Sequence, residues 1–374
     1  MTKRHPDPGP CCLDKCQALL FIAILALAYA AYFPGLAGPF LFDDFANLNA
    51  LGKYGGVRDY DTLRLYLFGG IAGPTGRPIA LLSFLLNDTD WPSSPESFKH
   101  TNLMLHLLTG TILFGLSRTL LRLNKSLSLS QAGTAALFVT GVWLLHPLLV
   151  STTLYIVQRM AILSTLFVLI GLWGYLHGRI LLQQRLTAGY LWMSTSLVLC
   201  TLLATLSKEN GVLLLPLALL AEQIVLKRQL SVQPDIRWSA LFLWLPVAVL
   251  TMYLISRGFN SSGFDQRPFT LPERLLTQPR ILLDYLRWWF IPGTSSPGLL
   301  TQDFPISQGL LNPPGTLYAL ILLVVAIAAS ILVRKNHYYL SFAILFFLVG
   351  HSLEAGPISL ELYFEHRNYL PGAF

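Results

Sequence analysis

Six short clusters of ionisable and polar side chains interrupt an otherwise apolar chain, and each cluster adjoins a hydrophobic stretch. Ionisable groups at the edge of a membrane are costly, and they mark a site when several of them converge. The clusters are Phe42-Asp43-Asp44-Phe45, Arg77-Pro78, His146-Pro147, Gln158-Arg159, Lys208-Glu209-Asn210 and Glu365-His366-Arg367-Asn368.

These side chains together suit the transfer of a sugar from a lipid-linked phosphate. Such a reaction needs a carboxylate that takes a proton from the acceptor hydroxyl, and Asp43 and Asp44 are the candidates. It also needs cations that stabilise the charge building up on the departing phosphate. We expect the phosphate to be bound by Arg159, Lys208, His366 and Arg367, and the supporting residues to be Arg77, His146, Gln158, Glu209 and Glu365.

Each cluster also has a purely structural interpretation. An Asp pair after a helix can cap the next helix, and a lone Arg159 or Lys208 can anchor a helix at the membrane surface. His146 precedes a proline and can simply mark a helix end, while His106 is expected to pack between helices. The joint occurrence of acids and bases on one face favours the functional interpretation.

The elements that must position these clusters are membrane helices. The chain has 374 residues, of which 53% are hydrophobic and 12% charged, whereas a soluble domain carries roughly a quarter charged residues. We therefore predict an all-α polytopic membrane protein, a bundle of about nine or more transmembrane helices in a single domain over 1–374. The apolar segments are 17–37, 102–121, 132–150, 157–177, 188–206, 211–226, 238–256, 316–333 and 339–352.

The distribution of Lys and Arg predicts the orientation of these segments. Basic residues precede the first segment and follow the second, fourth, sixth and eighth, which places the N-terminus in the cytoplasm. The net charge of +7 is therefore a topology signal and not a nucleic-acid signature. All six polar clusters then fall on the non-cytoplasmic face, together with a first outer loop over 38–101 and a large outer loop over 257–315. The latter contains an amphipathic stretch over 281–290, which suits the membrane interface.

The clusters also resemble a known family in their order and spacing. The chain is similar to membrane glycosyltransferases of the GT-C superfamily, and most similar to the membrane part of the transmembrane and tetratricopeptide-repeat O-mannosyltransferases and their bacterial relatives. The resemblance covers nearly the whole chain. It rests on Phe-Leu-Phe-Asp-Asp (40–44), Arg-Pro-Ile-Ala-Leu-Leu-Ser-Phe (77–84), Asn-Leu-Met-Leu-His (102–106), His-Pro (146–147), Tyr-Ile-Val-Gln-Arg (155–159), Ser-Lys-Glu-Asn-Gly (207–211) and Glu-His-Arg-Asn-Tyr-Leu-Pro (365–371).

The resemblance implies an inverting transfer from a polyprenyl-phosphate-linked sugar to a protein Ser/Thr or a glycan or lipid hydroxyl. An acidic residue of the first outer loop is then the base, Asp43 or Asp44, with Asp44 slightly favoured. No cofactor and no metal site are expected, and the expected location is a bacterial inner membrane with a periplasmic site. The chain ends at Phe374 directly after a charged cluster, which suggests a fragment with further spans beyond it, and the tetratricopeptide repeats that often follow in this family are absent from this sequence.

Two other functions are compatible with the sequence. A polymerase or ligase of lipid-linked glycans would use the same class of donor, but the Asp pair after the first segment favours transfer of a single sugar. A membrane transporter would place charges near the bilayer midplane and commonly shows inverted repeats, and no repeat is visible in this chain.

Overall fold

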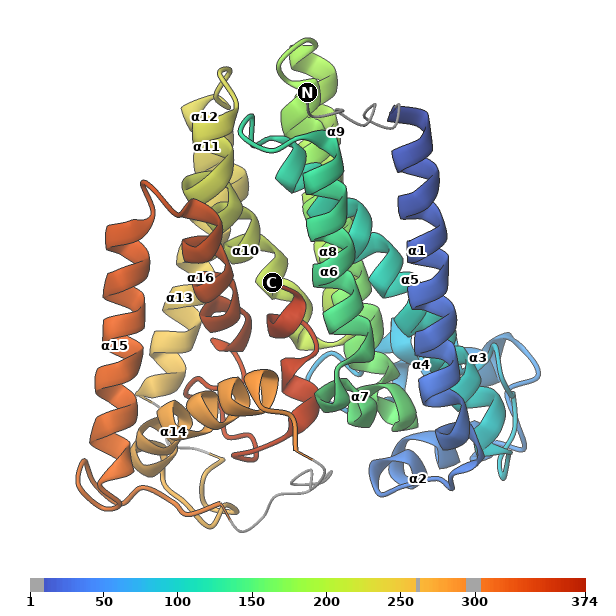
Figure 1. Cartoon of the computed structure of the whole chain (residues 1–374). Coiled ribbons are helices and arrows are strands. Elements are labelled where there is room, and N and C mark those ends of the chain that lie inside the picture. The colour runs from blue at the N-terminus through green and yellow to red at the C-terminus, as the bar shows by residue number, and fades with distance from the viewer. Residues whose placement is uncertain (1–9, 260–262, 294–303) are drawn as a thin grey trace, which may run out of the picture.

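The computed structural model describes residues 10–259, 263–293 and 304–374, and all regular elements in these ranges are helices (Figure 1). This confirms the predicted all-α membrane class. Each long apolar stretch is helical because backbone groups in lipid have no water to bind. Seven helical segments are long and apolar enough to cross a membrane: Lys15–Ala37, Pro95–Arg122, Ile156–Leu181, Leu186–Ser207, Glu209–Gln229, Ile236–Gly258 and Gly315–Val333.

The expectation of nine or more spans is slightly too high for the described chain. The third apolar segment forms two helices, Leu129–Leu145 and Pro147–Leu154, which meet at an angle of 54° and give an eighth span only if counted as one. Pro147 explains the break, because proline lacks an N–H group and cannot continue the helix before it. The last apolar helix, α16 (Tyr338–His351), has 14 residues and is about 21 Å long, which is shorter than the hydrocarbon core.

The helix connections separate into two ends of the bundle. The turns after α5 (Pro95–Arg122), α8 (Arg159–Leu181) and α15 (Gly315–Val333) lie at the upper end in Figure 1, near the start of α1 (Pro10–Tyr32). These are the turns that the sequence marks as basic. The short helices α2 (Asp43–Leu48), α3 (Tyr60–Phe68), α4 (Pro78–Phe84) and α7 (Val150–Leu154) lie at the lower end. The predicted division of the loops between two ends of the bundle is thus present. Which of these ends faces the cytoplasm stays a prediction.

Helix α8 forms the centre of the bundle. Its span is 83% buried, whereas the span that ends in α13 (Leu245–Gly258) is only 6% buried. The close neighbour of α8 is α9 (Leu186–Ser207), and small residues permit this approach. A Cβ added at Gly174 would lie 2.4 Å from Ser196 Oγ, and one added at Gly178 would lie 2.9 Å from the backbone nitrogen of Met193.

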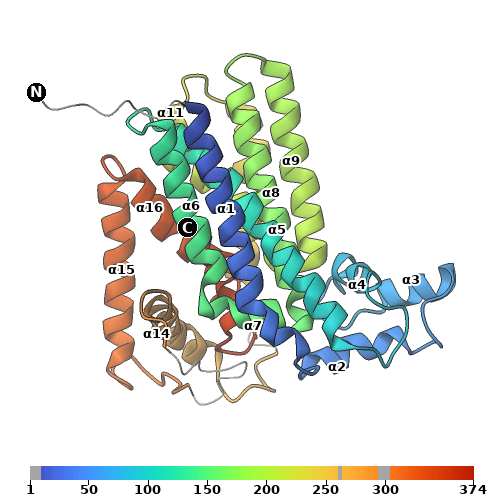
Figure 2. The same cartoon turned by 45° about the vertical axis from the view of Figure 1, so that its right-hand side comes forward.

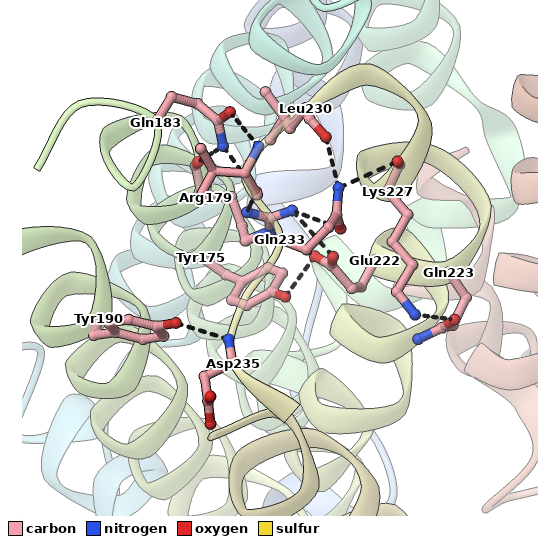
Figure 3. Close-up of polar contacts among 11 residues, drawn as sticks. Tyr175, Arg179, Gln183, Tyr190, Glu222, Gln223, Lys227, Leu230, Gln233 and Asp235 are labelled. Carbon is pink, nitrogen blue, oxygen red and sulfur yellow. Dashed lines mark hydrogen bonds and ion pairs between the residues drawn. The ribbon is translucent and has the colours of Figure 1, made fainter. Parts of the chain in front are cut away.

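A buried ion pair joins the upper end of α8 to Glu222, the first residue after α10 (Leu214–Ala221) (Figure 3). Arg179 donates from Nε to Glu222 Oε2 at 2.8 Å, and the Tyr175 hydroxyl donates to the same oxygen at 2.8 Å. A second Arg179 nitrogen donates to the carbonyl of Val232 at 2.9 Å. The sequence placed Arg179 in a basic loop after the fourth segment. It lies instead inside α8 with no exposed surface, because its charge is neutralised by a carboxylate from a later helix.

Helix α14 (Leu271–Phe290) crosses the other helices near the lower end of the bundle (Figures 1 and 2). It begins with a capping box, in which Thr270 Oγ1 accepts from the backbone of Glu273 and the Glu273 carboxylate accepts from the backbone of Thr270. The amphipathic stretch predicted over 281–290 is the second half of this helix. α14 packs against the segment that follows α16, and it thereby positions the last polar cluster.

Candidate functional site

The acidic pair fastens the start of α2 to the start of α8. The Asp44 carboxylate accepts from the backbone N–H of Val157 at 2.7 Å and from that of Leu41 at 2.9 Å. The backbone N–H of Asp43 donates to the hydroxyl of Tyr155 at 2.8 Å. Because Val157 and Tyr155 flank the turn that leads into α8, the acidic pair and the Gln158-Arg159 cluster are held as one unit.

The two acids have different environments. Asp44 has no exposed surface, and this burial raises the pKa of its carboxyl to about 6, although the two backbone N–H groups and the ammonium of Lys99 act in the opposite direction. Asp43 is exposed to solvent. An acceptor hydroxyl can therefore reach Asp43 without rearrangement, whereas Asp44 is enclosed by the backbone that it holds.

Strained backbone occurs at two non-glycine residues of the described chain, and both adjoin the predicted clusters. Phe42, directly before Asp43, has φ 33°, and Arg77 has φ 55°. The left-handed region is unfavourable for residues with a Cβ, so such strain persists only where the surrounding contacts impose it, and it is frequent at active sites. This supports a functional role for the first outer loop.

Arg77 forms an ion pair with Glu209, which lies at the lower end of α9. Arg77 donates to Glu209 Oε2 from Nη2 at 2.7 Å and from Nε at 3.1 Å. Thr75 donates to the other carboxylate oxygen at 3.0 Å, and Arg77 Nη1 contacts Met160 Sδ at 3.2 Å. Both charged side chains keep about a fifth of their surface exposed. The second and fifth clusters are thus joined at the start of α8.

Lys208 pairs with a residue that the sequence analysis missed, Glu354. The Nζ–Oε1 distance is 2.9 Å, and both side chains are at least nine-tenths buried. Lys208 also lines a narrow pocket with His366 and Arg367, between α8 and the C-terminal segment. The pocket volume is 10 Å³, about the space of one water molecule, so a larger ligand enters only if a side chain moves.

The last cluster is held by buried arginines. Arg367 donates from Nη1 to the carbonyl of Leu362 at 2.8 Å and from Nη2 to that of Glu361 at 2.7 Å. Arg274 of α14 donates to the carbonyls of Glu354, Gly356, Leu360 and Glu361. Burial, and then repulsion from Arg367, lower the pKa of Arg274 to about 9. Through these hydrogen bonds, the two arginines hold the segment from Glu354 to Leu362, which leads into the cluster.

Positive charge exceeds negative charge around this pocket. Burial acts to raise the pKa of the Glu354 carboxyl, but the charges of Lys208 and Arg367 hold this pKa well below the usual range. The other carboxylates nearby are Glu209, Glu361 and Glu365, and the cations are Arg77, Lys208, Arg267, Arg274 and Arg367, so positive charge exceeds negative charge by one. Glu354 Oε2 and Arg367 Nε are buried without a hydrogen-bond partner. An excess of cations in a region of low dielectric constant favours the binding of an anion.

The remaining predicted residues are buried in structural contacts. Arg159 has no exposed surface. It donates to Asn102 Oδ1 at 2.6 Å and to the carbonyls of Ser83 and Phe98, both at 2.8 Å. His146 accepts at Nδ1 from the backbone of Leu148 at 3.2 Å, which leaves the proton on Nε2, 3.1 Å from the carbonyl of Trp289. Gln158 and Glu365 are likewise buried.

The first turns of α8 connect these groups. Asp44 contacts Val157, Arg77 contacts Met160, and Ser164 donates to the Lys208 carbonyl at 3.4 Å. At 1.5 Å per residue, this stretch covers about 10 Å. The structure therefore arranges along one helix the acidic pair, Arg77, Glu209, Lys208, His366 and Arg367. His106 is instead packed between helices, as expected, and its Nδ1 is 2.8 Å from the Tyr369 hydroxyl.

Three residues of the site were missed by sequence reasoning: Lys99, Tyr155 and Glu354. Glu354 carries a signal that could have been used, because it is an ionisable residue three positions after the end of α16 at His351. Tyr155 begins the Tyr-Ile-Val-Gln-Arg motif (155–159), where no role was assigned to it, and Lys99 carries no comparable signal, since its importance depends on contacts across the bundle. Among the described residues, no group of three or more His, Cys, Asp and Glu side chains is arranged to hold a metal ion.

Comparisons with known proteins add no assignment to this geometry: no family model, curated protein or solved structure matches the chain. The multi-pass membrane class therefore rests on the helices themselves.

Proposed function

We propose that this protein is a membrane glycosyltransferase. It would move a sugar from a polyprenyl-phosphate-linked donor to a hydroxyl acceptor on the non-cytoplasmic face. The observation that carries the proposal is the excess of cations around Lys208 and Arg367, beside His366, connected through the start of α8 to an exposed carboxylate that directly follows the strained Phe42. An anion-binding centre and a general base at the same end of a membrane bundle are the two parts that this reaction needs.

The cationic pocket is suited to the phosphate of the donor. Arg367 Nε is buried and unpartnered, so a phosphate oxygen would satisfy it and add a charge-assisted hydrogen bond. Burial and the neighbouring Lys208 lower the pKa of His366 well below its ordinary value, which leaves a neutral imidazole that can donate one hydrogen bond. His366 is only partly buried, and its rotation would open the narrow pocket to a phosphate group.

The exposed Asp43 is the better placed of the two acids for the base. Its carboxylate takes the proton of the acceptor hydroxyl while the hydroxyl oxygen forms a bond to the anomeric carbon. The bond between that carbon and the phosphate oxygen breaks on the opposite face, which inverts the configuration, and the lipid phosphate leaves with both bonding electrons. Asp44 acts as a positioning residue, because both of its carboxylate oxygens hold backbone N–H groups.

Arg159 has a different role in this proposal from the one expected at first. Its guanidinium is enclosed by three neutral acceptors and lies against the rings of Phe84 and Phe98, 4.7 and 5.6 Å from their centroids. It therefore anchors α4 and α5 to the start of α8, and the phosphate contacts fall to Lys208, His366 and Arg367.

Mass spectrometry of whole-cell glycans and polyprenyl-phosphate sugars tests the function. We would compare wild type, a strain lacking the gene, and that strain carrying Asp43→Asn or the control Asp61→Asn. Asp61 is an exposed acid of the same outer region, in α3. We expect loss of one glycan and accumulation of one lipid-linked sugar, restored by the Asp61 variant and not by the Asp43 variant. Unchanged profiles in the deletion strain would refute a transferase and favour a transporter.

A further inference from the structure

Helix α14 presents two different polar faces. Gln278 donates to the carbonyl of Leu362 at 3.1 Å, and the Tyr285 hydroxyl donates to that of Phe364 at 2.8 Å. With Arg274, these residues form the face directed at the candidate site. At 3.6 residues per turn, Arg280 and Arg287 lie roughly 140° and 160° around the helix from this face, and Asp284 lies about 100° from it. The first face supports the proposed phosphate site, whereas the charged residues of the second face have no part in it.

This second face lines a separate pocket of 360 Å³. The pocket lies between α14 and the first turn of α15, where Gly315 and Ala319 form its wall together with Phe304. In Figures 1 and 2, α14 crosses α15 near the lower end of the bundle. The pocket therefore opens at one end of a helix that is long and apolar enough to span a membrane.

Two arginines give the pocket a net positive charge. Arg280 donates to the Pro305 carbonyl at 2.7 Å and lies 5.0 Å from the centroid of the Phe304 ring. The side chain of Arg287 is 68% exposed, and its Nη1 is 3.7 Å from Asp284 Oδ1. Asp284 Oδ2 is already occupied, because it accepts from the Tyr363 hydroxyl at 2.9 Å and from Trp288 Nε1 at 3.2 Å. Two cations facing one carboxylate leave one positive charge for a ligand.

Exposed apolar side chains lie on the same two helices that line the pocket. On α15, Tyr318 is 63% exposed, Ile321 52% and Val324 63%. Phe290, at the end of α14, is 82% exposed. An amphipathic helix with exposed aromatic residues and cations at the end of a membrane span is typical of the membrane interface.

We infer that the pocket between α14 and α15 binds an anionic diacyl phospholipid. The phosphodiester would lie between Arg280 and Arg287, and the acyl chains would run along the exposed side of α15. A headgroup with one net negative charge matches the single excess positive charge, whereas a zwitterionic headgroup does not. The lipid-linked donor is a different ligand, because its phosphate must reach Arg367 and Lys208 on the other side of α14. The inference is therefore independent of the proposed function.

Native mass spectrometry of the purified full chain tests this inference without any activity assay. Phosphatidylglycerol and phosphatidylcholine would be added in equal amounts to the protein in detergent, with inorganic phosphate in a parallel sample. We expect phosphatidylglycerol to remain bound in preference to phosphatidylcholine. Each cation near an anionic lipid contributes about fivefold in affinity, so Arg287→Gln should lower retention about fivefold and the Arg280→Gln/Arg287→Gln variant about twenty-fivefold.

A matched control removes two exposed charges at the other end of α15, in Arg334→Gln/Lys335→Gln. This variant should keep the preference for phosphatidylglycerol. Arg287 is exposed, so its single variant tests the site even if the double variant fails to fold. The inference is overturned by equal retention of the two lipids, by an unaffected Arg287 variant, by equal loss in the control variant, or by displacement of the lipid by inorganic phosphate or by polyprenyl phosphate at equal concentration.

Discussion

The carboxylate of Asp44 accepts a hydrogen bond from the backbone N–H of Val157, 113 residues further along the chain, at 2.7 Å. This contact joins the first outer loop to the turn that begins the central helix α8. It explains how an acidic pair that follows the first membrane helix is fixed at the same end of the bundle as the cations contributed by later helices. It also distinguishes two acids that are adjacent in sequence, since Asp44 is enclosed and Asp43 is exposed.

The first prediction concerns these two acids. Asp43→Asn should abolish sugar transfer with normal membrane insertion, because it removes the charge of the exposed base while the amide can still accept a hydrogen bond from the Tyr155 hydroxyl. Asp44→Asn should lower both activity and stability, because an amide retains only one acceptor oxygen for the two backbone N–H groups. Transfer by purified protein and its melting temperature in detergent would be measured. Full activity of both variants would rule out the acidic pair as the base.

The second prediction is a pH dependence of stability. The pKa of Asp44 is raised from 3.8 to about 6 in the folded protein by burial, so folding favours its protonated form. The stability contributed by this group is complete below about pH 4 and is lost as the pH rises through 6. Between pH 5 and pH 7 the loss is roughly 1 kcal/mol. Thermal unfolding in detergent should show this loss in wild type and a smaller one in Asp44→Asn. Identical pH profiles would contradict it.

The third prediction uses two glycines with similar backbone. Gly73 has φ 73° and Gly55 has φ 75°, and a Cβ at Gly73 would lie 2.3 Å from Glu209 Oε1, whereas one at Gly55 would meet nothing within 4 Å. Both Ala variants should therefore lose about 1–2 kcal/mol from the left-handed conformation. Only Gly73→Ala should also displace Glu209 from Arg77 and reduce transfer. Equal activity of the two variants would show that the Arg77–Glu209 pair does not support the site.

The fourth prediction concerns the buried pair of Lys208 and Glu354. Removal of one partner leaves an uncompensated buried charge, so Lys208→Met or Glu354→Met should each destabilise the protein by about 3–5 kcal/mol. The double variant should be destabilised by less than the sum, which a double-mutant cycle measures directly. We expect it to remain inactive, since it lacks the cation at the phosphate pocket. Additive effects on unfolding would mean that the two groups do not interact.

The fifth prediction concerns orientation. Tyr54 lies in the first outer loop and is 47% exposed, so a reporter fused after this residue should be detected on the non-cytoplasmic face. A reporter fused after Lys125, in the basic turn between α5 and α6 (Leu129–Leu145), should be detected in the cytoplasm. The reverse result would place the acidic pair and the cationic pocket in the cytoplasm and remove the basis for a non-cytoplasmic transferase.

The sequence by itself determined the fold class and the placement of the polar clusters at one end of the helix bundle. Long apolar segments must be helical in lipid, and alternation of spans then sends the loops after odd-numbered segments to one end. For this reason Asp43, Arg77, Lys208 and Arg367 could be grouped before any contact was known. The number of spans was less certain, because helix length and the break at Pro147 depend on local backbone geometry.

Only the tertiary structure decided what each charged residue does. Arg159 and Arg179 are both basic residues of α8, yet one is enclosed by neutral acceptors and the other is paired with Glu222. Lys208 and Glu354 are 146 residues apart in the chain. The protonation state of a buried side chain and its accessibility to a ligand depend on partners that helix packing brings close. Because these partners are distant in the chain, the local sequence does not identify them.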